Sequence, residues 1–131
     1  MPFALSPKAG MVLSCNFEGY KHPEIVKRRP VVVISPSHLA RPSLFTVIPL
    51  SSTPPNPVWP YHYLLPVSPF PKWPKASWAK CDMVATVNIS RLDRIQLVSR
   101  GPYEIYYVNM DVVRELRKCA ALSFGLDISQ E

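Results

Sequence analysis

Proline is the residue that most restricts the fold of this chain. The sequence has 16 prolines in 131 residues, against an average of roughly 5%. Because proline fixes φ and lacks a backbone N–H, this density works against long helices and favours short strands joined by rigid turns. The length and the 47% hydrophobic content are typical of one globular domain. We therefore expect a single domain over residues 1–131, with a proline-rich loop region at about 51–76.

The apolar pattern predicts many short strands. Residues 30–35, "PVVVIS", begin with a proline and continue as a β-branched run, which is typical of a strand buried on both faces. The other predicted strands lie at 11–17, 44–50, 92–98 and 103–108, with a strand, turn and strand over 77–90. Residues 61–66 could add a strand inside the proline-rich region, and residues 35–42 could form a short helix or turn.

The C-terminal part has a different period. Apolar residues recur there at steps of three and four, at Val112, Val113, Leu116, Cys119, Ala120 and Phe124. This spacing predicts one amphipathic helix, capped by Asn109 or Asp111 and ending before Gly125. Together these elements predict a mainly β (α+β) fold, a small curled barrel with a helix packed against it.

Charge and cysteine content limit the partners and the compartment. The net charge of +6 favours a partner that carries phosphates or acidic groups. Cys15, Cys81 and Cys119 are widely spaced and odd in number, which argues against a disulfide framework and favours a reducing compartment. No apolar run approaches the ~20 residues of a membrane span. We expect a cytoplasmic protein that does not enter a membrane.

The residues that could support chemistry lie at strand ends. Neither a metal site nor a bound cofactor is expected, because His22, His38 and His62 are not near cysteines or carboxylates at ligand spacing. Cations (Lys27, Arg28, Arg29) precede one strand, hydroxyls (Ser51, Ser52, Thr53) follow the next, and Lys80, Cys81 and Asp82 follow a later one. If these ends converge on one rim, the groups could perform phosphoryl chemistry. Solvated loop charges and ordinary turn residues explain the same pattern.

The order of these motifs is decisive. The series "KAGMVLSCNF", "HPEIVKRRPVVVIS", "FTVIPLSS" and "SWAKCDMVATVNISRLDRI", followed by the helix, resembles the MazF/PemK (Kid) toxins of type II toxin–antitoxin systems over roughly residues 9–124. The resemblance implies an SH3-like small barrel (CcdB/MazF-like) that forms homodimers. It also implies metal-independent cleavage of single-stranded RNA, in which the 2′-OH attacks phosphorus to give 2′,3′-cyclic phosphate and 5′-OH ends. The other implied partner is a cognate acidic antitoxin.

The resemblance also implies site residues. Arg29 falls on the family's active-site arginine, Ser51 on its usual threonine, and Asp82 and Lys80 on an acidic residue and an arginine of the PemK branch. A guanidinium suits the charge that builds on a phosphorane, so we expect Arg29 to clamp the transition state. Ser51 would hold a phosphate oxygen. Asp82 would be the base, with Lys80 as its electrostatic partner or the leaving-group acid; the proton acceptor could also be Arg29.

Further positions are expected to contact RNA. Glu24 matches a loop glutamate of the family, and His22 lies one place from its loop histidine. Lys27, Arg28 and Ser52 would follow the RNA backbone. The aromatic residues Trp59, Trp73, Trp78, Tyr61 and Tyr63 could stack on bases or simply pack in the core.

The chain departs from the family at two of these places. Ala85 stands where the family often has arginine, and Val26-Lys27-Arg28 replaces a loop that usually carries glycine. These changes keep alternatives open: a catalytically degenerate RNA-binding module, a CcdB-like poison of a protein target, or a basic SH3-like adaptor.

Overall fold

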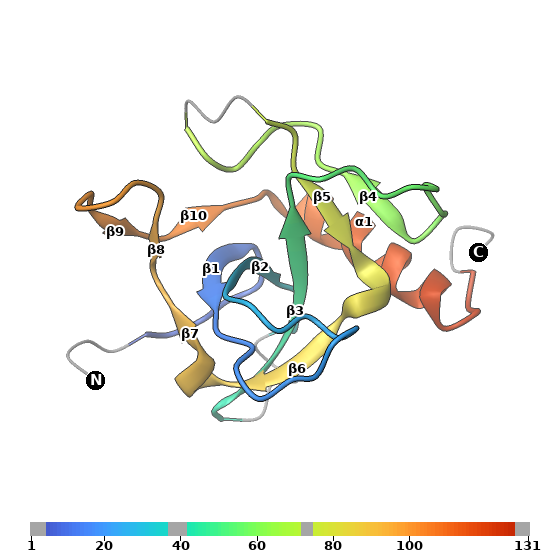
Figure 1. Ribbon diagram of the computed structural model, residues 1–131. Helices are drawn as coiled ribbons and strands as arrows, with labels where there is room; N and C mark the ends of the chain where they lie inside the picture. The colour runs from blue at the N-terminus through green and yellow to red at the C-terminus, as the bar shows by residue number, and fades with distance from the viewer. Residues whose placement is uncertain (1–4, 37–41, 72–74, 128–131) are drawn as a thin grey trace.

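Short antiparallel strands make up most of the computed structural model, which describes residues 5–36, 42–71 and 75–127. One α-helix within these ranges follows the strands (Figure 1). The strands are β1 Met11–Cys15, β2 Arg29–Val33, β3 Leu44–Ser51, β4 His62–Leu64, β5 Trp78–Lys80, β6 Ala85–Asn88, β7 Leu92–Asp93, β8 Ile95–Gln96, β9 Tyr103–Glu104 and β10 Tyr106–Tyr107. Two single-turn 3₁₀ helices, η1 Cys81–Met83 and η2 Ile89–Arg91, flank β6, and the α-helix is α1 Met110–Ser123.

The strands β1, β2 and β3 form the centre of the sheet. Val12 of β1 lies opposite Val32 of β2, and Val32 lies opposite Ile48 of β3. The β-branched run of β2 is fully buried, with Val31, Val32 and Val33 all at 0% exposure. This confirms the prediction of a strand buried on both faces, because successive side chains point to opposite faces of the sheet.

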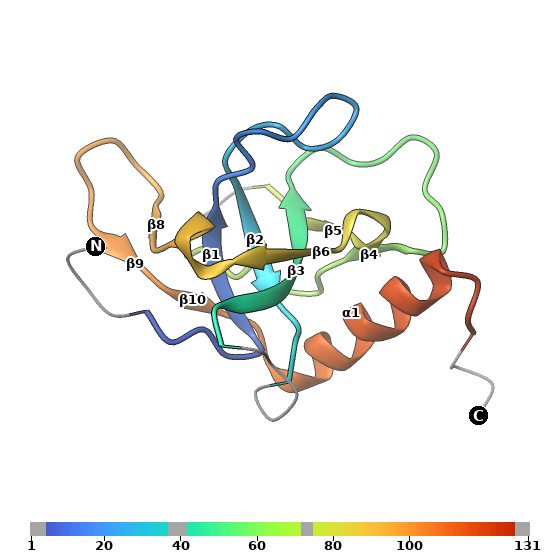
Figure 2. The same cartoon turned by 90° about the horizontal axis from the view of Figure 1, so that it is seen from below.

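The sheet curls around one of its two cores. β6 pairs with the outer edge of β3, and β7, which follows it after η2, pairs with the outer edge of β1. The chain therefore passes from one side of the central strands to the other (Figures 1 and 2). The inner cluster contains Leu13, Phe17, Val31, Val47 and Leu92, among other buried residues. The observed fold is the mainly β, barrel-like architecture with a C-terminal helix that the sequence predicts.

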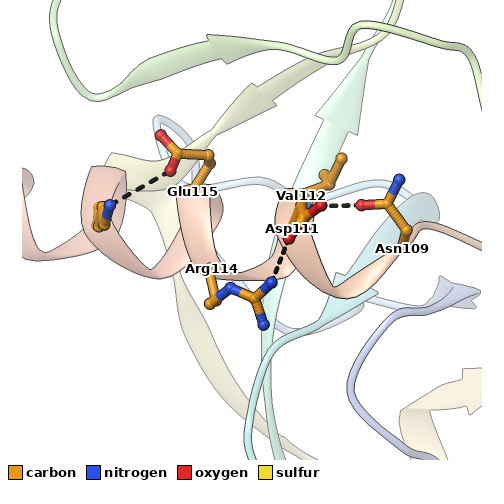
Figure 3. A network of polar contacts seen from close by, with 6 residues as sticks. Asn109, Asp111, Val112, Arg114 and Glu115 are labelled. Carbon is orange, nitrogen blue, oxygen red and sulfur yellow. Dashed lines mark hydrogen bonds and ion pairs between the residues drawn. The ribbon is translucent and has the colours of Figure 1, made fainter.

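Helix α1 covers the opposite face of the sheet. It contacts η1 and β4 and runs along one side of the strands in Figure 2. Leu116, at 0% exposure, and Val112 join Ile48 and Leu50 in a second apolar cluster. Asn109 caps the helix, because its Oδ1 accepts a hydrogen bond of 2.9 Å from the N–H of Val112 (Figure 3). Asp111 instead pairs with Arg114, so of the two predicted caps Asn109 takes the role.

The last predicted strands are shorter than expected. The predicted strand at 92–98 divides into β7 and β8, which pair with different partners, β1 and β9. The break lies at Arg94, whose N–H donates a hydrogen bond of 2.7 Å to Oδ1 of Asp93 instead of joining a ladder. The predicted strand at 103–108 divides in the same way into β9 and β10.

Two other predictions concern less regular segments. β4 lies inside the proline-rich region, where the sequence allowed a strand at 61–66. The predicted short helix or turn at 35–42 falls mostly outside the described residues, as does His38. Within the described ranges, no helix is long and apolar enough to cross a membrane.

Candidate functional site

A cavity of about 530 Å³ opens where β2 begins and β3 ends. In Figure 1, the β8–β9 pair and residues 65–71 lie on two sides of this end of β3. Polar residues from five strands and their flanking loops line the cavity: Ser14, Arg28, Arg29, Ser51, Ser52, Ser77, Asp93, Arg94 and Gln96. The apolar part of the wall includes Pro30, Leu50, Phe70, Ile95, Leu97 and Tyr103. A cavity of this kind, with cations beside apolar and aromatic walls, suits a ligand that carries both phosphate and a ring.

Arg29, at the start of β2, and Ser51, at the end of β3, both line this cavity. Val31 of β2 lies opposite Pro49 of β3, and the same register, continued by two residues, brings Arg29 toward Ser51. Arg29 is exposed and Ser51 is half-buried. The Ser51 hydroxyl accepts a hydrogen bond of 3.1 Å from the N–H of Thr53, so it also shapes the turn that follows β3. Its own proton stays available as a donor to an anion.

Arg28 contributes a second guanidinium to the cavity. Its Nη1 donates a hydrogen bond of 3.0 Å to the hydroxyl oxygen of Ser14 in β1. Ser14 is 8% exposed and Arg28 is exposed, so a buried anchor fixes a cation that solvent can reach. The sequence predicted Arg28 only as a contact to the RNA backbone, because the loop charges gave no sign of this anchor.

Lys80 and Asp82 lie apart from this cavity. Lys80 ends β5, where it lies opposite His62 of β4, and Asp82 belongs to η1. The Nε2 atom of His62 lies 3.8 Å from Oδ1 of Asp82. Nδ1 of His62 accepts a hydrogen bond of 3.0 Å from the N–H of Trp59, so Nε2 is the nitrogen that faces the carboxylate. The predicted catalytic residues therefore form two groups. Arg29 and Ser51 line the cavity, and Lys80 and Asp82 lie near His62.

The loop before β2 has its own internal contacts. Glu24 closes a turn with Lys21, because its Oε1 accepts a hydrogen bond of 2.7 Å from the N–H of Lys21 and its own N–H donates to the carbonyl of Lys21 at 2.7 Å. His22 and Lys27 are exposed. Glu24 thus helps to shape the loop, and Lys27 extends the basic surface that begins at Arg28.

Comparison with known families decides the identity. Residues 8–119 match the model of the family described as "PemK-like, MazF-like toxin of type II toxin-antitoxin system". The chain belongs to this family of PemK/MazF toxins. A comparison with curated protein sequences gives no match.

Solved structures of PemK/MazF toxins have the same fold. MazF from Deinococcus radiodurans superposes with a TM-score of 0.69 at 21% identity, over 94% of this chain and 100% of that one. The MazE–MazF structure from the same organism gives a TM-score of 0.62 at 21% identity, over 95% and 100% of the two chains. The Mycobacterium tuberculosis toxin MazF-mt6 gives 0.58 at 19% identity, over 90% and 98%.

Two buried thiols of this PemK/MazF toxin have raised pKa values. Burial raises the pKa of the Cys15 thiol to about 11, although Arg91 and Arg28 oppose the shift. A hydrogen bond with Cys119 and burial raise the pKa of Cys81, so both thiols stay protonated at neutral pH. The described residues contain no group of three or more His, Cys, Asp or Glu side chains that could hold a metal ion.

The aromatic residues have different environments. Trp59 is 52% exposed, which leaves its ring free to contact a ligand. Tyr61 and Tyr63 are half-buried and pack against the cluster that α1 covers. Trp78 is half-buried in β5, and Trp73 lies outside the described residues. Ala85, where the family often has arginine, is half-buried in β6 opposite Val47.

Sequence analysis missed Ser14, Ser77 and Gln96 of the cavity lining, and it also missed three charged or titratable residues. Asp93 and Arg94 line the cavity, and His62 faces Asp82. The sequence "RLDRI" places Asp93 and Arg94 beside two apolar residues, but a short apolar alternation gives no indication of which strand lies alongside. Only the pairing of β7 with β1 brings them to the cations.

Proposed function

We propose that this PemK/MazF toxin is an endoribonuclease that cuts single-stranded RNA at a short sequence, without a metal ion. The observation that supports the proposal is that Arg28, Arg29 and Ser51 line the same cavity. Arg29 and Ser51 are at the positions at which the family has its active-site arginine and hydroxyl. Guanidinium groups hold phosphate oxygens through parallel hydrogen bonds and remain charged at any physiological pH.

The proposed reaction begins with the attack of a ribose 2′-oxygen on the adjacent phosphorus. Negative charge then builds on the non-bridging oxygens, and Arg29 stabilises it in the manner of an oxyanion hole. Ser51 donates a hydrogen bond to one of these oxygens. The products are a 2′,3′-cyclic phosphate and a 5′-OH end.

Other residues would contact RNA outside the cleaved bond. Arg28 and Ser52 line the same cavity, and Lys27, His22 and Glu24 belong to the loop that leads to it. Lys80 and Asp82, beside His62, would meet the RNA further along, where β5 continues from the strand end that pairs with Ser51. Asp82 remains a candidate base in this arrangement, with Lys80 as its partner.

We also propose the partners of a type II toxin. An acidic antitoxin segment would cover the basic cavity and exclude RNA, which fits the net charge of +6. Pairing of two copies of this chain is supported by exposed apolar residues near the end of α1, such as Phe124 at 74% and Leu126 at 59% exposure. Both partners and the RNA would meet in the cytoplasm.

The test is cleavage of a long single-stranded RNA by purified protein in EDTA, with the product ends mapped. Cuts at a recurring short sequence with 5′-OH ends, lost in Arg29→Ala, would support the proposed reaction. Lys118→Ala is a matched control, because it also removes one exposed cation but lies on α1, outside the residues that line the cavity. A folded protein that binds RNA in a salt-sensitive manner but makes no cuts would instead be a degenerate binding module. Ala85, where the family often has arginine, would then be the first position to test as the cause of the lost activity.

A further inference from the structure

The cavity holds a carboxylate that the family resemblance does not assign. Asp93 of β7 lies opposite Ser14 of β1, and Ser14 lies opposite Pro30 of β2. Residues directly opposite one another in a sheet project from the same face, and all three line the cavity. Asp93 therefore faces the space that Arg28 and Arg29 enter from the other side of β1.

The spacing of these groups suits a nucleotide. Two inter-strand steps separate Asp93 from Pro30, which is roughly 10 Å between their Cα atoms. A ribose with its 3′-phosphate spans this gap, with the phosphate toward the guanidinium groups and the 2′-OH toward the carboxylate. Asp82 lies outside the residues that line the cavity and faces His62 at 3.8 Å.

The hydrogen bonds of Asp93 leave one of its oxygens open. Oδ1 accepts the 2.7 Å bond from the N–H of Arg94, which fixes the orientation of the carboxylate. Within the described part of the chain, Oδ2 has no donor and the carboxylate has no ion pair. Asp93 is half-buried. An oriented carboxylate with one open oxygen is suited to accept a proton from a bound hydroxyl.

We propose that Asp93 is the general base of the RNA cleavage reaction, an inference that rests on the proposed function. Oδ2 of Asp93 takes the proton of the 2′-OH while the 2′-oxygen forms its bond to phosphorus. The bond from phosphorus to the 5′-oxygen breaks, and its electron pair stays on that oxygen, which takes a proton from solvent. Asp93 then returns its proton to solvent, so the reaction has no net change in protons or charge.

The test compares Asp93→Asn with Asp82→Asn in single-turnover cleavage of RNA in EDTA. The amide introduced by Asp93→Asn keeps an oxygen that can accept from the N–H of Arg94, so the loop geometry is retained while the base is lost. We expect the cleavage rate to fall by about 10²- to 10⁴-fold in Asp93→Asn and by less in Asp82→Asn, which removes an RNA contact. Glu115→Gln, at an exposed carboxylate of α1 outside the residues that line the cavity, is the control and should cleave at the wild-type rate. Thermal unfolding of each variant shows whether it is folded. If Asp93→Asn does not fold, Asp93→Ser provides a second variant with a local acceptor and no carboxylate.

Binding of a 2′-O-methyl RNA, which cannot be cleaved, separates catalysis from binding. Asp93→Asn should bind this RNA as tightly as the wild type or more tightly, because it removes a negative charge near the phosphate. A wild-type cleavage rate in Asp93→Asn, or a loss confined to Asp82→Asn, would overturn the assignment while leaving the proposed function intact. A wild-type protein that cuts no RNA would overturn the proposed function itself and the assignment with it.

Discussion

The side chain of Arg28 is fixed by Ser14, through a hydrogen bond of 3.0 Å from Nη1 to the hydroxyl oxygen. This bond ties the end of the loop before β2 to the neighbouring strand β1. Because Ser14 is almost fully buried, the anchor does not move with the loop. The remaining N–H groups of the guanidinium can then meet an anion without a large loss of side-chain entropy.

Loss of this anchor should weaken RNA binding. In Ser14→Ala, Arg28 keeps its charge but loses its fixed position, so we expect the affinity for a non-cleavable RNA to fall by about threefold to tenfold, the value of one ordinary hydrogen bond. Fluorescence anisotropy at fixed salt measures the change. Ser90→Ala, at an exposed serine outside the cavity, is the control and should bind normally. Equal affinities of both variants would show that the anchor has no role in binding.

Arg29 should be required for cleavage and dispensable for folding. Because its side chain is exposed, Arg29→Ala should change the free energy of unfolding by less than about 0.5 kcal/mol. The cleavage rate should fall by about 10²- to 10³-fold, as when one oxyanion-stabilising donor is removed. Arg29→Lys should recover little activity, because an ammonium cannot reproduce the two parallel hydrogen bonds. Full activity in Arg29→Lys would reduce the role of Arg29 to that of a simple positive charge.

Burial of Cys15 should make stability fall at high pH. The pKa of this thiol is raised from 9.0 to about 11 in the folded chain, so between these values the native state holds a proton that the unfolded state releases. The stabilisation is complete below pH 9 and is lost as the pH rises through 11, by about 3 kcal/mol in total. Urea unfolding at pH 8 and pH 10.5 measures the loss. Cys15→Ala should show a smaller loss, and an identical loss in both proteins would contradict the prediction.

The sequence predicts the fold well where one residue type dominates a segment. The β-branched run at 31–34 favours a buried strand, and the apolar spacing after Met110 favours a helix, as the structure confirms. The strand prediction fails at residues 92–98, because this single apolar run forms two strands, β7 and β8, that pair with different partners. The division depends on which strands the curled sheet brings alongside, and local alternation carries no information about distant partners.

Prediction of the candidate site is limited in the same way, because the sequence does not show which strands pair. Arg29 and Ser51 could be predicted together because each stands at the end of a strong strand and β2 and β3 are neighbours in sequence. Asp93 could not be predicted, because it reaches the cavity only through the pairing of β7 with β1. Resemblance groups Asp82 with Arg29, yet Asp82 lies beside His62 outside the cavity lining. Residue type alone does not show whether a side chain lines the cavity or lies elsewhere on the fold.

The two caps that the sequence allowed for α1 should differ in their effect on stability. Asn109 satisfies an N–H that would otherwise lack a partner at the start of the helix, so Asn109→Ala should lower the free energy of unfolding by about 1 kcal/mol. Asp111 makes an exposed ion pair with Arg114 and interacts with the helix dipole, so Asp111→Ala should cost only about 0.3–1 kcal/mol, and 1 M salt should reduce this cost. Urea unfolding at low and high salt measures both. A cost for Asp111→Ala that exceeds that for Asn109→Ala and persists in high salt would identify Asp111 as the effective cap.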